Sequence, residues 1–486
     1  MEATYSVVSL INSGLANLAA YLAAHVLLCL LPAFFIAGAM TALIPKEAVT
    51  RFLGRNSPKY ISYPAAAASG SLLAVCSCTI VPLFAGIYKK GAGIGPAITF
   101  LFFAPAANIL ALIYTGGLIG ADLAFARFFL SLVFGIGIGM IMAIIFSRDD
   151  TVHDAASDAL FAGGQAMNRS GFVLIGLLVA LLLSGTLKIG LLTNTYATLT
   201  LPIAGMDTLQ ETLLRLVPFD PAKGEEGVSA QGAILIVLLV FIGGTAWRGL
   251  ENVFEGLNHW TMISLALVAV TFLCAAVGMA PHAGGLDVLV NGKLIGVALS
   301  MAAIFMLLKT KFTEDEVCSF LWESWKFVKQ IFPLLLAGVF AVGVIRLIIK
   351  PEWIEAIAGD NSLTGNLAGV LFGIFMYFPT LVEVPIARMF LDLGMHRGPL
   401  LAYLMADPEL SLQSMLITAA IIGRLKTAAY VTCVAVFSAL SGMLYGMWID
   451  GANISLLLLY LAAFLVVLFV GLWRVNKRNA FEGKSM

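Results

Sequence analysis

Residues 121–146 read ADLAFARFFLSLVFGIGIGMIMAIIF, and the only charged side chains among them are Asp122 and Arg127. A helix of about 20 mostly apolar residues is long enough to cross the hydrocarbon core of a bilayer. Gly135, Gly137 and Gly139 predict a face of small residues for close packing against another helix. No strand precedes these glycines, so they do not indicate a dinucleotide-binding loop. The stretch therefore predicts a membrane-spanning helix.

The rest of the chain has the same character. It has 486 residues, of which 60% are hydrophobic and 12% charged, and its mean hydropathy is +0.98. Soluble proteins have about 45–50% apolar and about 25% charged residues, and disordered chains are less apolar still. Lys+Arg and Asp+Glu number 28 each, so there is no basic excess for binding nucleic acid. The composition predicts an all-α polytopic membrane protein that has the lipid bilayer as its partner.

A scan for membrane-length apolar stretches predicts about 11–13 membrane segments. The stretches lie at 20–44, 60–86, 94–116, 121–146, 171–192, 232–250, 260–280, 294–309, 331–349, 364–391, 398–421, 425–448 and 452–473. No Lys or Arg precedes Lys46, so the basic start of a secretory signal is missing and we expect the first segment to be retained. The six cysteines lie mostly in these segments, which excludes a secreted disulfide framework.

Glycine and proline positions recur at an offset of 303 residues, which predicts an internal repeat. The matching pairs are Pro82 and Pro385, Gly91 and Gly394, Gly95-Pro96 and Gly398-Pro399, Pro105 and Pro408, Gly120 and Gly423, and Gly139 and Gly442. We therefore divide the chain into an amphipathic lead-in (1–19), a first permease repeat (20–146), a middle membrane section (147–330) with loops at 147–170 and 193–231, a second repeat (331–448), and a last span with its tail (449–486).

The distribution of basic loops bears on the topology of the two repeats. Basic residues gather in 45–59, 309–330 and 474–484, and all three regions favour the cytoplasm. If every segment crosses, these regions fall on opposite sides of the membrane. If 60–86 and 364–391 are instead re-entrant hairpins, all three lie inside and the two repeats have inverted topology, as in many secondary transporters. Simple crossing stays the alternative, because charge bias is a noisy signal.

The tip of the first hairpin carries two cysteines. Residues 74–82 read AVCSCTIVP, with Cys76 and Cys78 followed by Thr79 and Pro82. On a helix, side chains two residues apart diverge by about 200°, whereas in unwound backbone they face the same way. Paired thiols are soft ligands that suit soft metals and trivalent metalloids. The alternative is that both are small packing residues, which is our interpretation of Cys29, Cys274 and Cys433.

The matching tip of the second hairpin carries an acidic residue. Residues 379–385 read PTLVEVP, so that Thr380 and Glu383 lie between Pro379 and Pro385. A charge within an apolar segment costs about 2.5–3.5 kcal/mol on insertion scales and often marks a proton relay. Glu383 is therefore a candidate for proton coupling, and the alternative is a static ion pair with Arg388. Pro82, Pro379 and Pro385 are the residues expected to break the hairpins.

Other polar residues in apolar segments give weaker signals. Asn108 follows Pro105 and is a candidate for lining a substrate cavity. Asp407 is expected to cap a helix break or to pair with Arg424. Arg127 is expected to be a buried partner or to extend to the interface. We predict a substrate-binding set of Cys76, Cys78, Thr79, Asn108 and Thr380, with no metal site and no cofactor.

These motifs resemble a family of bacterial predicted permeases, which includes the organoarsenical exporters. The first half is similar at Cys76-Ser77-Cys78, at Thr79-Ile80-Val81-Pro82 and at Gly95-Pro96-Ala97. The second half is similar at residues 379–385, 398–399, 404–406, 408, 411–412 and 414–415. The resemblance implies a multi-pass permease, with trivalent arsenicals as the substrate of some members. It would make the cysteine pair the position that meets arsenic.

We therefore predict a secondary-type permease, not an enzyme, in the bacterial inner membrane. It would export a small, thiol-reactive solute such as a trivalent organoarsenical, and it is a candidate homo-oligomer. One alternative is an intramembrane dithiol oxidoreductase, which would need a quinone or thioredoxin-like partner. Another is a passive channel, which would not need a membrane-embedded Glu383. No nucleotide-binding motif supports transport driven by ATP.

Overall fold

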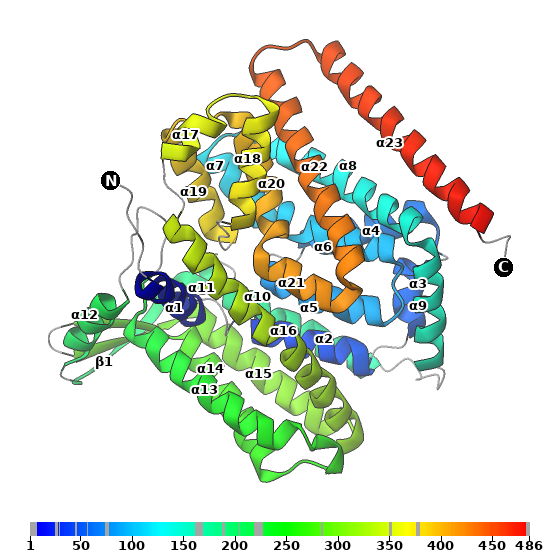
Figure 1. The fold of residues 1–486 in the computed structure, drawn as a ribbon. Coiled ribbons are helices and arrows are strands. Elements are labelled where there is room, and N and C mark those ends of the chain that lie inside the picture. Colours follow the sequence, from blue (N-terminus) through cyan, green and yellow to red (C-terminus); the bar gives the residue numbers. More distant parts are fainter. Residues whose placement is uncertain are drawn as a thin grey trace. The chain divides into compact units, whose positions relative to one another are not determined.

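The computed structural model describes residues 7–24, 28, 30–43, 46–55, 57–72, 77–160, 169–186, 190–203, 205–217, 227–282, 285–348, 352–375 and 380–482. In this part of the chain, eight helical segments are long and apolar enough to cross a membrane. The predicted all-α polytopic class is confirmed. The chain forms two compact units, residues 1–45 with 164–344 and residues 46–163 with 345–486 (Figure 1).

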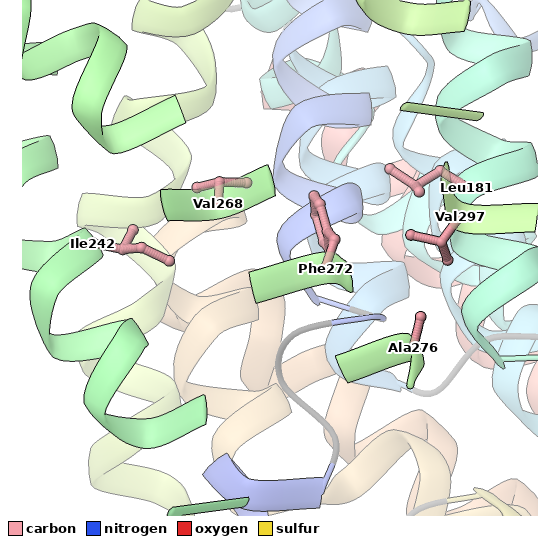
Figure 2. Packing of buried hydrophobic residues seen from close by; sticks show 6 residues of the cluster. All are labelled: Leu181, Ile242, Val268, Phe272, Ala276 and Val297. Atoms are coloured by element: carbon pink, nitrogen blue, oxygen red, sulfur yellow. The ribbon is translucent and has the colours of Figure 1, made fainter. Parts of the chain in front are cut away.

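The first unit is a bundle that carries one small sheet. Its helices are α1 (Val7–Ala24), α2 (Leu31–Leu43), α10 (Arg169–Thr186), α11 (Gly190–Thr193), α12 (Met206–Leu216), α13 (Ala230–Leu250), the 3₁₀ turn η3 (Val253–Glu255), α14 (His259–Ala276), α15 (Gly292–Lys311) and α16 (Glu314–Ile348) as far as Val344. α13 packs on α14, and α10 packs on both α2 and α15. Where these helices meet, the buried side chains are apolar: Leu181, Ile242, Val268, Phe272, Ala276 and Val297 (Figure 2).

The sheet lies in segments where the sequence predicts a loop and the end of a helix. β1 (Thr195–Leu201) and β2 (Gly278–His282) both pair antiparallel with β3 (Gly285–Asn291), in the order β1-β3-β2. The prediction of a loop over 193–231 is wrong for β1 and for α12. Strand β1 reads TYATLTL, rich in the β-branched and aromatic residues that favour strands. The strand contains three threonines, so it has no apolar run by which hydropathy would predict it.

The second unit contains the two segments that carry the predicted site. Its helices are α3 (Lys46–Leu53), α4 (Lys59–Leu72), α5 (Ser77–Lys89), α6 (Ile94–Ala106), α7 (Ile109–Leu118), α8 (Ala121–Ile145), α9 (Ser147–Leu160), α17 (Glu352–Ala358), α18 (Leu363–Phe375), α19 (Thr380–Asp392), α20 (Arg397–Leu410), α21 (Leu412–Ile422), α22 (Arg424–Ile449) and α23 (Ile454–Glu482). We refer to residues 46–163 as the first half of this unit and to residues 345–486 as its second half.

The prediction of a polar loop over 147–170 is wrong for residues 147–160, which form α9. Asp149 and Asp150 lie in its first turn, where a negative charge favours the helix dipole. Asp150 Oδ1 also accepts a hydrogen bond from the backbone N–H of Ile94 at 3.0 Å. One turn further on, the ring of His153 stacks on that of Tyr88 with centroids 4.0 Å apart. The charges thus stabilise and anchor a helix.

Both predicted hairpins begin and end on one side of the second unit. Gly54 bridges Ala92, which places the start of α4 beside the end of α5. In the second half, the N–H of His396 donates to the carbonyl of Ala358 at 2.9 Å, which brings the start of α18 and the end of α19 together. Each of these helices has at most 14 residues, or about 21 Å, which is less than the roughly 30 Å of a bilayer core. Each pair of helices therefore begins and ends on the same side of the unit.

Equivalent helices of the two halves begin at an offset of 303 residues. The pairs of first residues are Ser77 and Thr380, Ile94 and Arg397, Ile109 and Leu412, and Ala121 and Arg424. Four glycines with positive φ follow the same offset, since Gly91 (87°) matches Gly394 (91°) and Gly120 (152°) matches Gly423 (90°). The contacts between the halves are reciprocal, because α5 packs on α21 and α7 packs on α19.

The two equivalent long helices, α8 and α22, run antiparallel. Asp122, at the start of α8, accepts a hydrogen bond from Tyr445 near the end of α22. Asp149, just beyond α8, pairs with Lys426 at the start of α22. Between these points, the rings of Phe134 and Phe437 pack edge to face with centroids 4.8 Å apart. Hairpin α4–α5 and hairpin α18–α19 consequently open at opposite ends of the unit.

We name these ends by one residue each. The Gly54 end holds Gly54, Ala92, Asp149, Asp150 and Lys426. The Asp450 end holds Asp122, Ala358, His396, Arg397 and Asp450.

Candidate functional site

A buried ion pair joins the two halves of the second unit. Glu383 Oε1, in the first turn of α19, lies 2.8 Å from Nη2 of Arg127 in α8, and both side chains are fully shielded from solvent. Glu383 Oε2 has no hydrogen-bond partner within the described part of the chain. Arg127 is therefore the counter-charge of Glu383, and the predicted partner, Arg388, instead pairs with Asp392 at 3.2 Å on the surface.

Arg127 also holds an interruption in the broken span α6–α7. α6 ends at Ala106 and α7 begins at Ile109, and we call the gap between them the first break. Arg127 Nε donates to the carbonyl of Ala106 at 2.7 Å, and Nη1 donates to the hydroxyl of Thr115 at 3.3 Å. The end of a helix leaves carbonyl groups without partners, and a guanidinium is a suitable donor for them. Arg127 thus links the first break to the tip of hairpin α18–α19.

Asn108 stabilises the same break by capping α7. Its Oδ1 accepts from the N–H of Ala111 at 2.8 Å, and its Nδ2 donates to the carbonyl of Pro105 at 3.2 Å. The side chain is 1% exposed, so both bonds are shielded from water. Asn108, one of the predicted substrate-binding residues, thus holds two helix ends together.

The other predicted residues are described to different extents. Cys76 and Pro379 lie outside the described residues. Cys78, Thr79 and Thr380 lie in the first turns of α5 and α19, and their side chains are outside the described part. Pro82 and Pro385 both lie inside helices, five residues after α5 and α19 begin. The helices α4 and α18 end before these prolines, at Leu72 and Phe375.

A second buried polar cluster lies where α20 ends and α21 begins, which we call the second break. The hydroxyl of Tyr430 in α22 donates to Glu409 Oε2 at 2.6 Å, and both side chains are almost fully buried. Ser411, between the two helices, donates to the hydroxyl of Ser414 at 2.8 Å. The buried Gln413 also lies in this turn. Glu409, Gln413 and Tyr430 were not singled out in the sequence.

The repeat register contains the signal that would have found them. Tyr430 lies 303 residues after Arg127, and Glu409 lies 303 residues after Ala106. The residue pair that contacts across the first break therefore has an equivalent pair that contacts across the second. Comparing polar residues between the halves, and not only glycines and prolines, would have drawn attention to both positions.

Ionic bridges between the halves lie at both ends of the second unit. At the Asp450 end, Arg397 contacts both carboxylate oxygens of Asp122, at 2.9 and 3.2 Å, and Tyr445 donates to the same carboxylate at 2.9 Å. At the Gly54 end, Lys426 lies 3.3 Å from Asp149. Asp407 is fully buried near the end of α20, whereas Arg424, its predicted partner at the start of α22, is exposed.

The described residues hold no group of three or more His, Cys, Asp or Glu side chains that could bind a metal ion together. The site is instead a set of buried charges at two helix breaks. Such an arrangement suits a solute or proton pathway, because broken helices place free backbone groups and ionisable side chains within the membrane.

The comparisons with known proteins agree with a membrane permease. Residues 12–447 match the family model described as "Predicted permease". The chain is 32% identical over 453 residues to UPF0718 protein MJ0584 of Methanocaldococcus jannaschii, which covers 92% of this chain and 98% of that protein. It is also 32% identical over 92 residues to UPF0718 protein YraQ of Escherichia coli (strain K12), covering 19% of this chain and 26% of that protein. No solved structure matches significantly.

Proposed function

Because the chain belongs to the predicted permease family, we propose that it is a secondary transporter of the bacterial inner membrane, with two inverted repeats. The proposal is supported by the antiparallel course of α8 and α22 and by hairpins that open at opposite ends. Inverted repeats with broken helices are a recurrent design of secondary transporters.

The observation that carries the proposal is the Arg127–Glu383 ion pair. It connects the tip of one half's hairpin to the broken span of the other half, so breaking it would release the two halves from each other at this point. A proton on Glu383 would neutralise the carboxylate and weaken its attraction to Arg127. Protonation of this one residue would thereby couple a proton gradient to a movement between the halves.

The proposed cargo is a soft, thiol-reactive solute such as a trivalent organoarsenical, which is exported. Support comes from the Cys76 and Cys78 pair and from the resemblance of this motif to permeases that include organoarsenical exporters. Cys78 lies in the first turn of α5, at the tip of the first hairpin. A pair of thiols would bind such a solute reversibly, because release needs fewer bonds to break than a three-thiolate cage would require.

The test of the cargo is growth in methylarsenite with single cysteine variants. Cys76→Ser and Cys78→Ser should each lower resistance. The double variant should be little less resistant than the single variant with the larger loss. Serine is nearly isosteric, so the amount of protein in the membrane should be unchanged on blots. Cys274→Ser and Cys433→Ser, in α14 and α22, are the matched controls and should protect cells like the parent. Full protection by the Cys76 and Cys78 variants would contradict the thiol mechanism.

The test of proton coupling is Glu383→Gln in everted vesicles. The variant should lose transport driven by a pH gradient, because an amide cannot take up and release a proton at neutral pH. Cargo counterflow, which needs no net proton movement, should be retained to a greater degree. Gradient-driven transport at the parent rate would leave Glu383 as a structural partner of Arg127 only.

A further inference from the structure

The second break differs from the first in the charge that it buries. At the first break, Arg127 donates to the carbonyl that ends α6 and pairs with Glu383, so a fixed cation balances a fixed anion. At the second break, the equivalent of Arg127 is the neutral Tyr430, and the equivalent of Ala106 is the acidic Glu409. No basic side chain forms an ion pair with Glu409 in the described part of the chain. The second break thus has an acid where the first has a base.

Several polar atoms at the second break have no hydrogen-bond partner in the part of the chain that the structure describes. Glu409 uses Oε2 to accept from Tyr430, whereas its Oε1 has no partner among the described residues. Both polar atoms of the Gln413 side chain, Oε1 and Nε2, also have none there, although Gln413 is fully buried. A buried polar group without a partner costs about 1–3 kcal/mol, so three such atoms in one turn point to a missing ligand.

The polar residues are not needed to form the break itself. The first break is built with Ala106, Leu110 and Ala111 at the positions where the second has Glu409, Gln413 and Ser414. Both breaks nevertheless separate helices with equivalent first residues, Ile109 and Leu412. The architecture is compatible with apolar residues at all three positions, so the polar ones serve another purpose.

The chemistry of these atoms selects the ligand. The end of α20 presents free carbonyl groups and the negative pole of the helix dipole, which favour a cation. Carboxylate, amide and hydroxyl oxygens are hard donors, and they come here from Glu409, Gln413 and the Ser411–Ser414 pair. A proton would need only one of these oxygens and would leave Gln413 unexplained. A small alkali cation uses several at once.

We propose that the second break is a sodium site, formed by Glu409 Oε1, Gln413 Oε1 and the free carbonyl groups at the end of α20. The sodium ion takes the place that the guanidinium of Arg127 holds at the first break. One break therefore carries a tethered cation and the other an exchangeable one. A role for this sodium ion in transport rests on the proposed function. Sodium binding itself does not depend on the cargo.

The test measures thermal unfolding of the purified full chain in lipid nanodiscs, without cargo or gradient. Sodium chloride is exchanged for choline chloride at constant ionic strength. A ligand that binds only the folded state stabilises it by RT ln(1 + [L]/Kd), so the melting temperature keeps rising with the logarithm of ligand concentration above Kd. We expect the melting temperature of the parent to rise in this way with Na⁺, and to rise less with K⁺.

Two variants install the residues that the first break carries at the same positions. Glu409→Ala should abolish the Na⁺-dependent shift, and Gln413→Leu should raise the Na⁺ concentration at which the shift begins at least tenfold. The surface variant Glu314→Gln is the control and should keep the parent's response. The Gln413 variant also serves if Glu409→Ala fails to fold, because it leaves the Tyr430–Glu409 hydrogen bond in place.

Three results would overturn the sodium site. They are equal shifts in sodium and choline, an unchanged Na⁺ response in both variants, or a response to pH alone that depends on Glu409. These outcomes are separate from those of the transport assays. If the cysteine variants lose arsenical resistance but the parent's melting temperature does not respond to Na⁺, the sodium site alone is refuted. If the melting temperature responds to Na⁺ but the parent does not transport arsenicals, the proposed cargo alone is refuted.

Discussion

Arg127 and Glu383 depend on each other to different degrees. Glu383 has Arg127 as its ion-pair partner, whereas Arg127 also donates to Ala106 and Thr115. Removing one member of a buried ion pair costs about 3–5 kcal/mol, because the remaining charge is left uncompensated. Removing both leaves no charge and costs less.

We therefore expect Arg127→Met to destabilise the protein by about 3–5 kcal/mol and Glu383→Met to cost less. The double variant should be more stable than Arg127→Met alone. It should still fall short of the parent by about 1–3 kcal/mol, because the carbonyl of Ala106 loses its donor. Thermal unfolding of all four proteins completes the cycle, and additive losses would show that the pair is not coupled.

At this scale, the sequence was informative about Glu383 and misleading about its partner. A charge in an apolar segment is visible in the sequence, so the residue could be found. Arg388 was the suggested partner because it is near in the chain, but residues five apart on a helix are not on the same face. Arg127 is far away in sequence, and it comes close to Glu383 because α7 packs on both α8 and α19.

Among helices, the decisive contact is the close approach of α6 to α8 at two glycines. A Cβ atom on Gly139 would lie 2.6 Å from the carbonyl oxygen of Gly95, which is backbone and cannot rotate away. The second half repeats the contact, since a Cβ on Gly442 would lie 2.5 Å from the carbonyl oxygen of Gly398. Small residues at these crossings let the helix backbones touch.

We expect Gly139→Ala and Gly442→Ala each to destabilise the protein by about 1–3 kcal/mol, because the helices must separate. Gly137→Ala is the matched control on the same helix, since its Cβ would have only Phe437 nearby, at 3.9 Å. That change should be neutral or stabilising by about 0.5–1 kcal/mol, because alanine favours the helix. Melting temperatures of the three variants check this, and a loss for Gly137→Ala as large as the others would refute the packing argument.

Much of the helix pattern could be predicted, because hydropathy and glycine and proline positions are local signals. Hydropathy does not predict elements built from polar residues. The helix α9 is rich in aspartate and β1 in threonine, so neither contains a long apolar run. Helix α16 extends from Glu314 through the charged stretch into the predicted span as one element, because charges at its start favour the helix.

For the whole molecule, the ends of the second unit lead to a topology prediction. With the Gly54 end in the cytoplasm, cysteines placed at residues 55 and 476 should react only from the cytoplasmic side. A cysteine at residue 450 should react only from the opposite side, and the charge pattern of the loops predicts the same side for residue 225. Labelling in a background without the native cysteines measures this. Finding residues 55 and 450 on the same side would contradict both the hairpins and the antiparallel course of α8 and α22.

The bridge at the Asp450 end leads to a second prediction. Asp122→Arg should slow transport at least tenfold, because two cations would then face each other next to Tyr445. Combining it with Arg397→Asp should restore much of the rate, since the ion pair is formed again with its charges exchanged. Initial rates in vesicles measure this, with Arg388→Asp as the control, since that residue pairs on its own helix. No recovery in the double variant would mean that the pair does not hold the halves together.

The two end bridges are unequal in strength. Asp122 is held by two guanidinium contacts and a tyrosine hydroxyl, whereas Asp149 has one lysine at 3.3 Å and is more than half exposed. A bidentate arginine pair is more stable than an exposed lysine pair. The weaker bridge, at the Gly54 end, should therefore break first. The distribution of basic loops places this end in the cytoplasm. For the proposed exporter, a state open at this end would take up cargo from the cell interior, and the stronger bridge would keep the opposite end closed to the outside.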